Sequence, residues 1–90
     1  MNRPVRLLVV MDPIDHIKYH KDTTLALLLA AARRGYALHY AELADLCLVD
    51  SEARARTRTL EVRANSTDWY SLGESTSGGL GSFDVILMRK

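Results

Sequence analysis

The chain has 90 residues, enough for one small domain. Hydrophobic residues make up 48% and charged residues 26%, which are ordinary globular values and argue against disorder. The net charge of +1 gives no basic field for nucleic acid or an anionic membrane, and the longest apolar run, residues 25–32, is too short to span a bilayer.

The first expected element is a buried β-strand over residues 5–11. Only Arg6 interrupts its apolar character, and continuous apolar residues indicate burial on both faces, as in a central parallel strand. Pro13 cannot donate to a ladder and biases Asp12 away from helix, so the strand ends there. Residues 14–21 are polar and are expected to form a loop.

A helix is expected from about Thr23 to Arg34. Asp22 or Thr23 is a good N-cap, and Gly35 supplies the left-handed residue that closes the helix. Residues 25–32 are apolar on every side, so we expect one face against the sheet and another against a subunit or a further domain. This strand, loop and helix form the front half of a βαβ unit.

Residues 36–43 predict a second strand, parallel to the first because the connection is a right-handed helical crossover. Residues 46–49 and 53–62 predict a β-hairpin closed around Asp50–Ser51. Three arginines, here called the arginine face, share one side of the second arm with two apolar residues: Arg54, Arg56 and Arg58 with Leu60 and Val62.

The last third of the chain predicts a short helical turn carrying Trp69, Tyr70 and Leu72, then a flexible glycine-rich surface loop over residues 73–82. Residues 83–88 predict a third strand of the buried type. The expected fold is a single α/β domain over residues 1–90, a Rossmann-like three-layer lobe. Its mostly parallel sheet has the local strand order 2-1-3 and an inserted β-hairpin. A crossover helix normally follows such a third strand, so we expect the domain to be truncated from a longer protein.

Charged residues follow the first and third buried strands. Asp12 ends the first and Arg89–Lys90 the third. In the order 2-1-3 these strands are neighbours, and ligands bind in the crevice where the chain reverses direction between them. With Lys21 and the amides of residues 22–24, these groups would form one anion-favouring corner. The alternative, that Asp12 caps a turn and Arg89–Lys90 is solvated, stays open.

Other chemical groups give weaker signals. The arginine face could grip phosphates or an acidic partner, but a solvated strand face is commoner. His16, His20 and His39 lack the spacing of a metal site and are expected to be isolated surface residues, and residues 78–81 lack the context of a phosphate loop. Cys47, the only cysteine, is expected to be a small buried hydrophobe. It excludes an internal disulfide, and with no signal peptide evident we expect a cytoplasmic protein.

Several short blocks are distinctive in combination: Met11-Asp12-Pro13-Ile14, Lys21-Asp22-Thr23-Thr24, Arg33-Arg34-Gly35-Tyr36, Leu38-His39-Tyr40, Glu52-Ala53-Arg54-Ala55-Arg56, Thr57-Arg58-Thr59-Leu60 and Asp84-Val85-Ile86-Leu87-Met88-Arg89-Lys90. Together and in this order they resemble the N-terminal domain of prokaryotic glutathione synthetase. The resemblance covers nearly the whole chain, and the segment 75–82 departs from it as a variable loop.

The resemblance implies an ATP-grasp ligase that joins γ-glutamylcysteine to glycine through an acyl-phosphate, with ATP and Mg²⁺, and that assembles as a dimer or tetramer. In this family the later domains supply the ATP and metal ligands. The 90 residues are therefore expected to hold no catalytic residue, metal or cofactor and not to catalyse alone. The expected substrate-binding residues, cationic groups among them for the substrate carboxylates, are Asp12, Lys21, Asp22, Thr23, Arg89 and Lys90.

Two other functions remain open. A non-catalytic module that binds a small molecule or a protein would use the same edge of the sheet as its binding site, without an ATP-grasp domain. A NAD-type dinucleotide domain is disfavoured, because the loop after Met11 has no Gly-x-Gly-x-x-Gly to admit a pyrophosphate.

Overall fold

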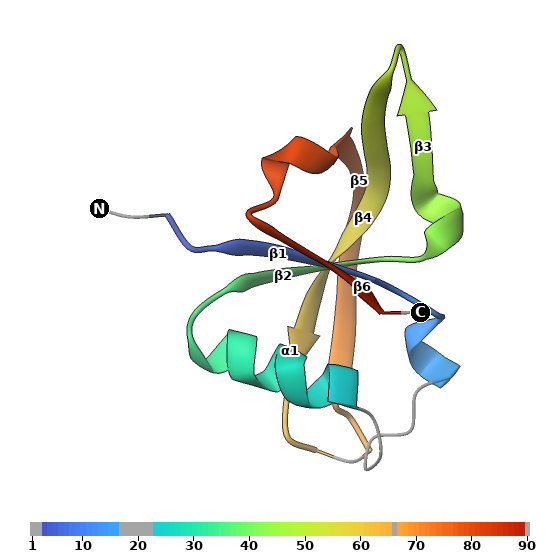
Figure 1. Ribbon diagram of the computed structural model, residues 1–90. Coiled ribbons are helices and arrows are strands. Elements are labelled where there is room, and N and C mark those ends of the chain that lie inside the picture. The colour runs from blue at the N-terminus through green and yellow to red at the C-terminus, as the bar shows by residue number, and fades with distance from the viewer. Residues whose placement is uncertain (1–2, 17–22, 66, 90) are drawn as a thin grey trace.

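A computed structural model describes residues 3–16, 23–65 and 67–89. Within these ranges a mixed six-stranded sheet carries one α-helix on one of its faces (Figure 1). The elements are β1 (Arg6–Met11), the 3₁₀ turn η1 (Ile14–His16), α1 (Thr23–Arg33), β2 (Ala37–Ala41), the 3₁₀ turn η2 (Leu43–Asp45), β3 (Leu46–Val49), β4 (Glu52–Val62), β5 (Tyr70–Gly79), the 3₁₀ turn η3 (Leu80–Ser82) and β6 (Val85–Arg89).

The centre of the sheet has the expected strand order. β1 pairs in parallel with β2 on one side and with β6 on the other, which confirms the local order 2-1-3. The prediction of a mostly parallel sheet is wrong. β4 pairs antiparallel with β2, β3 and β5, so antiparallel pairs outnumber parallel ones. The physical reason is that β3, β4 and β5 follow one another through short connections, which permit only antiparallel neighbours.

Helix α1 packs on one face of this sheet. Thr24, Leu25, Leu28 and Ala31 follow the spacing of one helix face and are buried. They meet inward-facing residues of β1, β2 and β4 in the larger apolar core, whose buried members include Leu7, Val9, Met11, Leu38, Tyr40 and Leu60. On the other side of α1, Leu27 is 47% exposed. The expected second contact of the helix therefore stays a prediction.

The end of α1 follows the sequence prediction. Gly35 has a φ of 80°, the left-handed conformation that glycine adopts without steric cost. Its N–H donates to the carbonyl of Ala32 at 3.0 Å, and the N–H of Tyr36 donates to the carbonyl of Ala31 at 3.1 Å. These two bonds form a Schellman motif, which satisfies carbonyls that the helix leaves open and turns the chain into β2.

The opposite face of the sheet has a smaller core without a helix. Leu8, Val10 and Ala41 are buried there, against the partly buried Leu46, Leu80 and Phe83. Turns and strand ends provide this cover, so in the described part of the chain the fold has a sheet and one helical layer. The expected three-layer arrangement is not confirmed.

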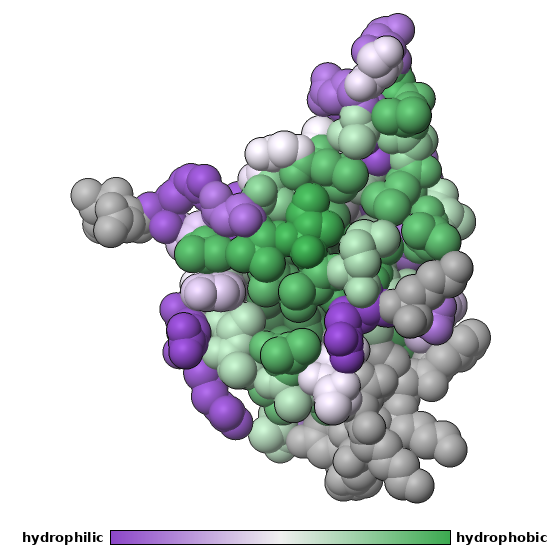
Figure 2. All heavy atoms as spheres, viewed as in Figure 1, coloured by the Kyte–Doolittle hydropathy of each residue, from purple (hydrophilic) through white to green (hydrophobic). Residues whose placement is uncertain are grey.

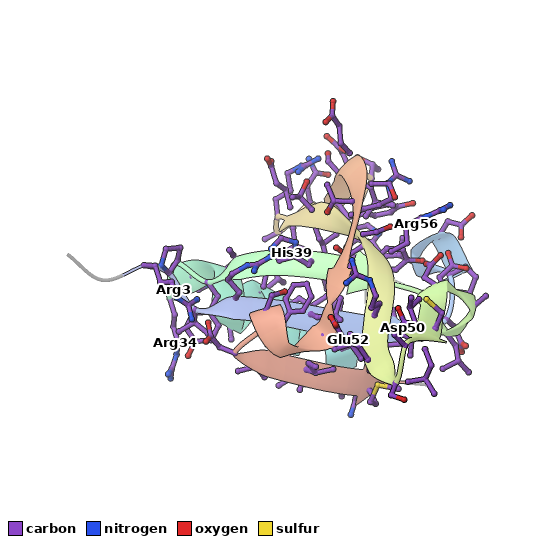
Figure 3. The ribbon with its side chains drawn as sticks, turned by 90° about the horizontal axis from the view of Figure 1, so that it is seen from above. Arg3, Arg34, His39, Asp50, Glu52 and Arg56 are labelled. Carbon is purple, nitrogen blue, oxygen red and sulfur yellow. The ribbon has the colours of Figure 1, made fainter. Side chains whose placement is uncertain are left out.

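The predicted hairpin is confirmed, and it extends away from the helix (Figures 1 and 3). Its two turn residues, Asp50 and Ser51, have φ values of 50° and 65°, as a tight turn between right-twisted strands requires. The prediction that Cys47 is buried is wrong. Cys47 is exposed, because β3 is an edge strand that extends beyond the core.

β5 replaces two predicted features. Residues 70–79 pair along β4, so the predicted helical turn and flexible loop are wrong in this segment. Trp69, just before β5, is buried in the larger core. The pairing shifts register between Arg58 and Leu60, near Gly73, where a Cβ would clash with the Oγ1 of Thr59. A larger residue at position 73 would therefore require the Thr59 side chain to move.

β6 is less buried than its sequence indicates. Val85, Ile86 and Met88 are 37%, 39% and 57% exposed, so the prediction of a strand buried along its length is wrong for the residues described. Among those residues β6 pairs with β1 alone, which leaves its second edge open.

Candidate functional site

The carboxyl ends of β1, β2 and β6 meet at one edge of the sheet, because these three strands are parallel neighbours. A pocket of about 190 Å³ lies at this edge. Its lining combines two carboxylate side chains with apolar groups: Val10, Met11, Asp12, Pro13, Glu42, Leu43, Ala44 and Met88. The pocket occupies the position where ligands bind in sheets that reverse their winding direction.

A buried tyrosine organises the loops around this pocket. The hydroxyl of Tyr40 accepts a hydrogen bond from the N–H of Ile14 at 3.1 Å and donates to Oε2 of Glu42 at 2.7 Å. Burial raises the pKa of Tyr40, and the hydrogen bond to the Glu42 carboxylate raises it further, so the phenol stays a donor. Tyr40 thereby ties the loop after β1 to the loop after β2.

Glu42 is held on its main-chain side as well. Its N–H donates to Oδ2 of Asp45 at 2.9 Å, and the N–H of Asp45 donates to the carbonyl of Glu42 at 2.9 Å. These reciprocal bonds fix the start of η2. The carboxylate of Glu42 is therefore held by Tyr40 of β2 and its main chain by Asp45 of η2, a fixed geometry of the kind expected of a binding group.

Arg89 lies at the same edge of the sheet but contacts the helix. It pairs with Met11 in the β1–β6 ladder. Its Nε donates to Oγ1 of Thr24 at 3.1 Å, and its Nη2 donates to Oγ1 of Thr23 at 2.9 Å. A guanidinium has five N–H donors, so these two bonds leave donors on the same group for a further acceptor.

The predicted site residues therefore fall into three groups. Asp12 lines the pocket beside Glu42. Thr23 and Arg89 contact each other at the start of α1, and Arg89 does not line the pocket. Lys21, Asp22 and Lys90 lie outside the described residues.

Sequence reasoning missed Tyr40 and Glu42. A signal for them was present, because the residues at the end of the second parallel strand must reach the same edge as Asp12. The predicted strand over residues 36–43 contains Tyr40 with no partner assigned to its hydroxyl, and Glu42 lies near the end of that strand.

The remaining chemical groups lie elsewhere. His39 is half-buried and packs edge-on against Phe83, with ring centroids 5.1 Å apart. Burial lowers the pKa of His39, and the neighbouring charge of Arg6 lowers it further. The arginine face is confirmed as one side of β4, where Arg54 pairs with Glu52 at 3.2 Å and Arg58 donates to the carbonyl of Gly73 at 2.9 Å.

Neither a metal cluster nor a membrane-spanning helix is found in the described ranges. No group of three or more His, Cys, Asp or Glu side chains there could hold a metal ion. No helix in these ranges is sufficiently long and apolar to cross a membrane.

Known proteins match this chain over nearly its full length. The sequence model of the family described as prokaryotic glutathione synthetase, N-terminal domain, matches residues 5–90. Glutathione synthetase of Salmonella typhimurium is 57% identical over 86 residues, and that of Citrobacter rodentium is 54% identical over 86. The protein of the same name from Escherichia coli strain K12 is 51% identical over 86 residues. In each comparison the match covers 96% of this chain and 27% of the relative, so the chain spans about a quarter of the relatives' length.

Proposed function

The chain belongs to the family of prokaryotic glutathione synthetase N-terminal domains, and from this premise we propose that the whole protein is a glutathione synthetase. It joins γ-glutamylcysteine to glycine in an ATP-dependent reaction through an acyl-phosphate. The 90 residues form the substrate-side part of this enzyme and do not catalyse ligation alone. The observation that carries the proposal is the family match over residues 5–90, together with 57% identity to a glutathione synthetase.

The edge where β1, β2 and β6 end is the proposed substrate side. γ-Glutamylcysteine and glycine both carry carboxylates, and the free donors of Arg89 suit bidentate recognition of such a group. Lys21, Thr23 and Lys90 are proposed to contribute donors or positive charge to substrate binding. Asp12 and Asp22 are proposed to order the loops or to meet a substrate ammonium group. Thr23 and Thr24 support the proposal, because their hydroxyls fix the orientation of Arg89.

ATP and Mg²⁺ belong, in this proposal, to other parts of the whole protein. Mg²⁺ is bound through carboxylates, waters and substrate phosphates. Among the described residues there is no group of three or more metal-ligating side chains, and the proposal assigns the ATP and metal ligands to the later domains. No step of the reaction is therefore assigned to them, and their part is to bind and orient the substrate.

The whole protein is further proposed to be a cytoplasmic dimer or tetramer. The face of α1 that carries Leu27, 47% exposed, supports a contact with a subunit or another domain. Light scattering of the purified protein measures this directly, and a strictly monomeric enzyme would contradict the oligomer.

The function is tested by assaying the purified whole protein for glutathione. We expect glutathione and ADP to form only when γ-glutamylcysteine, glycine, ATP and Mg²⁺ are all present. A polypeptide of residues 1–90 is the matched control and is expected to be inactive. The proposal fails if the whole protein makes no glutathione, and dipeptide binding without turnover would favour a non-catalytic binding module instead.

A further inference from the structure

The pocket at the carboxyl edge contains one acidic side chain that is held by the core. Oε2 of Glu42 accepts a 2.7 Å hydrogen bond from the hydroxyl of Tyr40, a residue that is only 4% exposed. Glu42 is half-buried, whereas Asp12, the other acidic residue that lines the pocket, is exposed. A carboxylate has about four acceptor positions, so the bond from Tyr40 leaves positions for the donors of a ligand. Glu42 is therefore a preorganised acceptor.

The walls of the pocket around Glu42 are largely apolar. Val10, Met11, Leu43 and Met88 contribute to them, and Figure 2 shows hydrophobic residues gathered at the centre of this side of the molecule. Apolar walls exclude water, and the attraction between opposite charges is stronger where water is excluded. The pocket therefore suits a ligand that carries a positively charged donor group on a short aliphatic chain.

One end of γ-glutamylcysteine has this chemistry. Its γ-glutamyl residue ends in an α-carbon that bears an ammonium group and a carboxylate, and a short aliphatic chain joins this carbon to the rest of the dipeptide. The carboxylate that reacts with glycine belongs to the cysteinyl residue at the other end. Arg89, proposed above to bind a substrate carboxylate, pairs with Met11 of the pocket in the β1–β6 ladder. This edge of the sheet therefore offers an acceptor for the ammonium group and donors for the α-carboxylate.

We propose that Glu42 is a specificity-determining residue that binds the α-ammonium group of the γ-glutamyl residue, and that Tyr40 is the positioning residue that holds Glu42. This inference rests on the proposed function and names the end of the dipeptide that this domain binds. Binding a part of the substrate that does not react still serves catalysis, because the binding energy helps to hold the reacting end in place.

Binding of two dipeptides to the whole protein tests the role of Glu42. One is γ-glutamylcysteine, and the other is glutarylcysteine, which has a hydrogen atom in place of the α-ammonium group. For the unmodified protein we expect calorimetry to give a dissociation constant about ten- to a hundredfold larger for glutarylcysteine, the range for losing a hydrogen bond to a charged group. In Glu42→Gln the side chain still accepts from Tyr40 but has no charge. Its affinity for γ-glutamylcysteine should fall by a similar factor, and its affinity for glutarylcysteine should not fall.

Glu61→Gln is the matched control for the lost charge. Glu61 is exposed on β4 and does not line the pocket, so its variant should leave both dissociation constants unchanged. Equal weakening of both dipeptides by Glu42→Gln would overturn the inference, because the loss would then not involve the ammonium group. Unchanged binding of γ-glutamylcysteine by Glu42→Gln would overturn it as well.

Tyr40 is tested against a variant that is destabilised elsewhere. Tyr40→Phe releases the Glu42 carboxylate, so the difference in affinity between the two dipeptides should narrow. Gly35→Ala is the control, because Gly35 has a φ of 80° and nothing lies within 4 Å of the new Cβ. Alanine there strains the backbone just before β2 and leaves the hydrogen bonds at the end of β2 intact. If Gly35→Ala narrows the difference as much as Tyr40→Phe, the positioning role of Tyr40 is refuted.

These measurements do not require turnover, so they separate this inference from the proposed function. A whole protein that makes glutathione but binds both dipeptides equally would retain the proposed function and lose the inference. A whole protein that discriminates between them through Glu42 but makes no glutathione would do the reverse. A whole protein that does not bind γ-glutamylcysteine would overturn both.

Discussion

The hydroxyl of Tyr40 donates a 2.7 Å hydrogen bond to Oε2 of Glu42 while it accepts one from the N–H of Ile14. Tyr40 is 4% exposed, so a single buried hydroxyl connects the loops that follow β1 and β2. The pocket at the carboxyl edge depends on this connection, because Asp12 and Glu42 come from those two loops.

Removing this hydroxyl should destabilise the protein. In Tyr40→Phe the ring still fills the core, but the N–H of Ile14 and the Glu42 carboxylate lose their partner. We expect a loss of about 1–3 kcal/mol in the free energy of unfolding, the cost of leaving a buried polar group unsatisfied. Urea denaturation measures it. Tyr36→Phe is the control, since the Tyr36 hydroxyl makes none of the hydrogen bonds found in the described chain, and an equal effect there would contradict this account.

The contact between β4 and β5 gives a second prediction. Gly73→Ala places a Cβ against the Oγ1 of Thr59 and should destabilise the protein by about 1–3 kcal/mol, as overpacking does. Gly78→Ala, where nothing lies within 4 Å of the new Cβ, should have a much smaller effect. The double variant with Thr59→Ala should recover part of the stability, since the clashing oxygen is removed. Equal destabilisation by the two glycine variants would argue against the close approach.

His39 gives a prediction of pH dependence. Burial and the charge of Arg6 lower its pKa below the ordinary value of 6.5. The unfolded chain therefore binds the proton more readily than the folded protein. Stability from this group is present above pH 6.5 and is lost as the pH falls from 6.5 through the lower pKa of the folded state.

Denaturation between pH 5 and pH 8 should show this loss in the unmodified protein, and His39→Gln should remove that part of the pH dependence, since ordinary histidine titration falls in about this range. Asp84→Asn is a suitable control. Hydrogen bonds from Arg3 and from the N–H of Arg6 lower the pKa of Asp84 below 3.8, so its contribution is lost only at more acidic pH. An unchanged pH profile in His39→Gln would show that another group is responsible.

Much of the central fold could be predicted, because local chemistry and tertiary structure agree there. β1 is continuously apolar and central, Gly35 closes α1, and Asp50–Ser51 turns the hairpin. β5 could not be predicted, because residues 71–79 are rich in serine and glycine and poor in β-formers. This segment is a strand because β4 supplies its hydrogen bonds, and that pairing leaves no signal in the composition of residues 71–79 themselves.

The candidate site was predictable in part for a similar reason. The end of a parallel strand is a position that sequence can locate, which brings Asp12 and Arg89 to one edge. Side-chain direction at that edge depends on the pleat and on the neighbouring loops. The pocket is therefore lined by Asp12 with Glu42, while Arg89 contacts Thr23 and Thr24.

The role proposed for Arg89 leads to a final prediction, made for the whole protein. Arg89→Ala removes a guanidinium whose orientation is fixed by the hydroxyls of Thr23 and Thr24. If its free donors bind a substrate carboxylate, the KM for γ-glutamylcysteine should rise about ten- to a hundredfold, the range for losing a hydrogen bond to a charged group. Arg89→Lys should restore little of the lost affinity, because an ammonium group cannot form the bidentate hydrogen bonds of a guanidinium.

Steady-state kinetics with each substrate varied in turn provides the measurement. Arg34→Ala is the matched control, because Arg34 is exposed at the far end of the helix from this edge (Figure 3). We expect it to leave both KM values unchanged. If Arg89→Ala lowers thermal stability with no change in either KM or kcat, Arg89 only anchors the start of α1. In that case the carboxylates of the substrate must be recognised elsewhere in the enzyme.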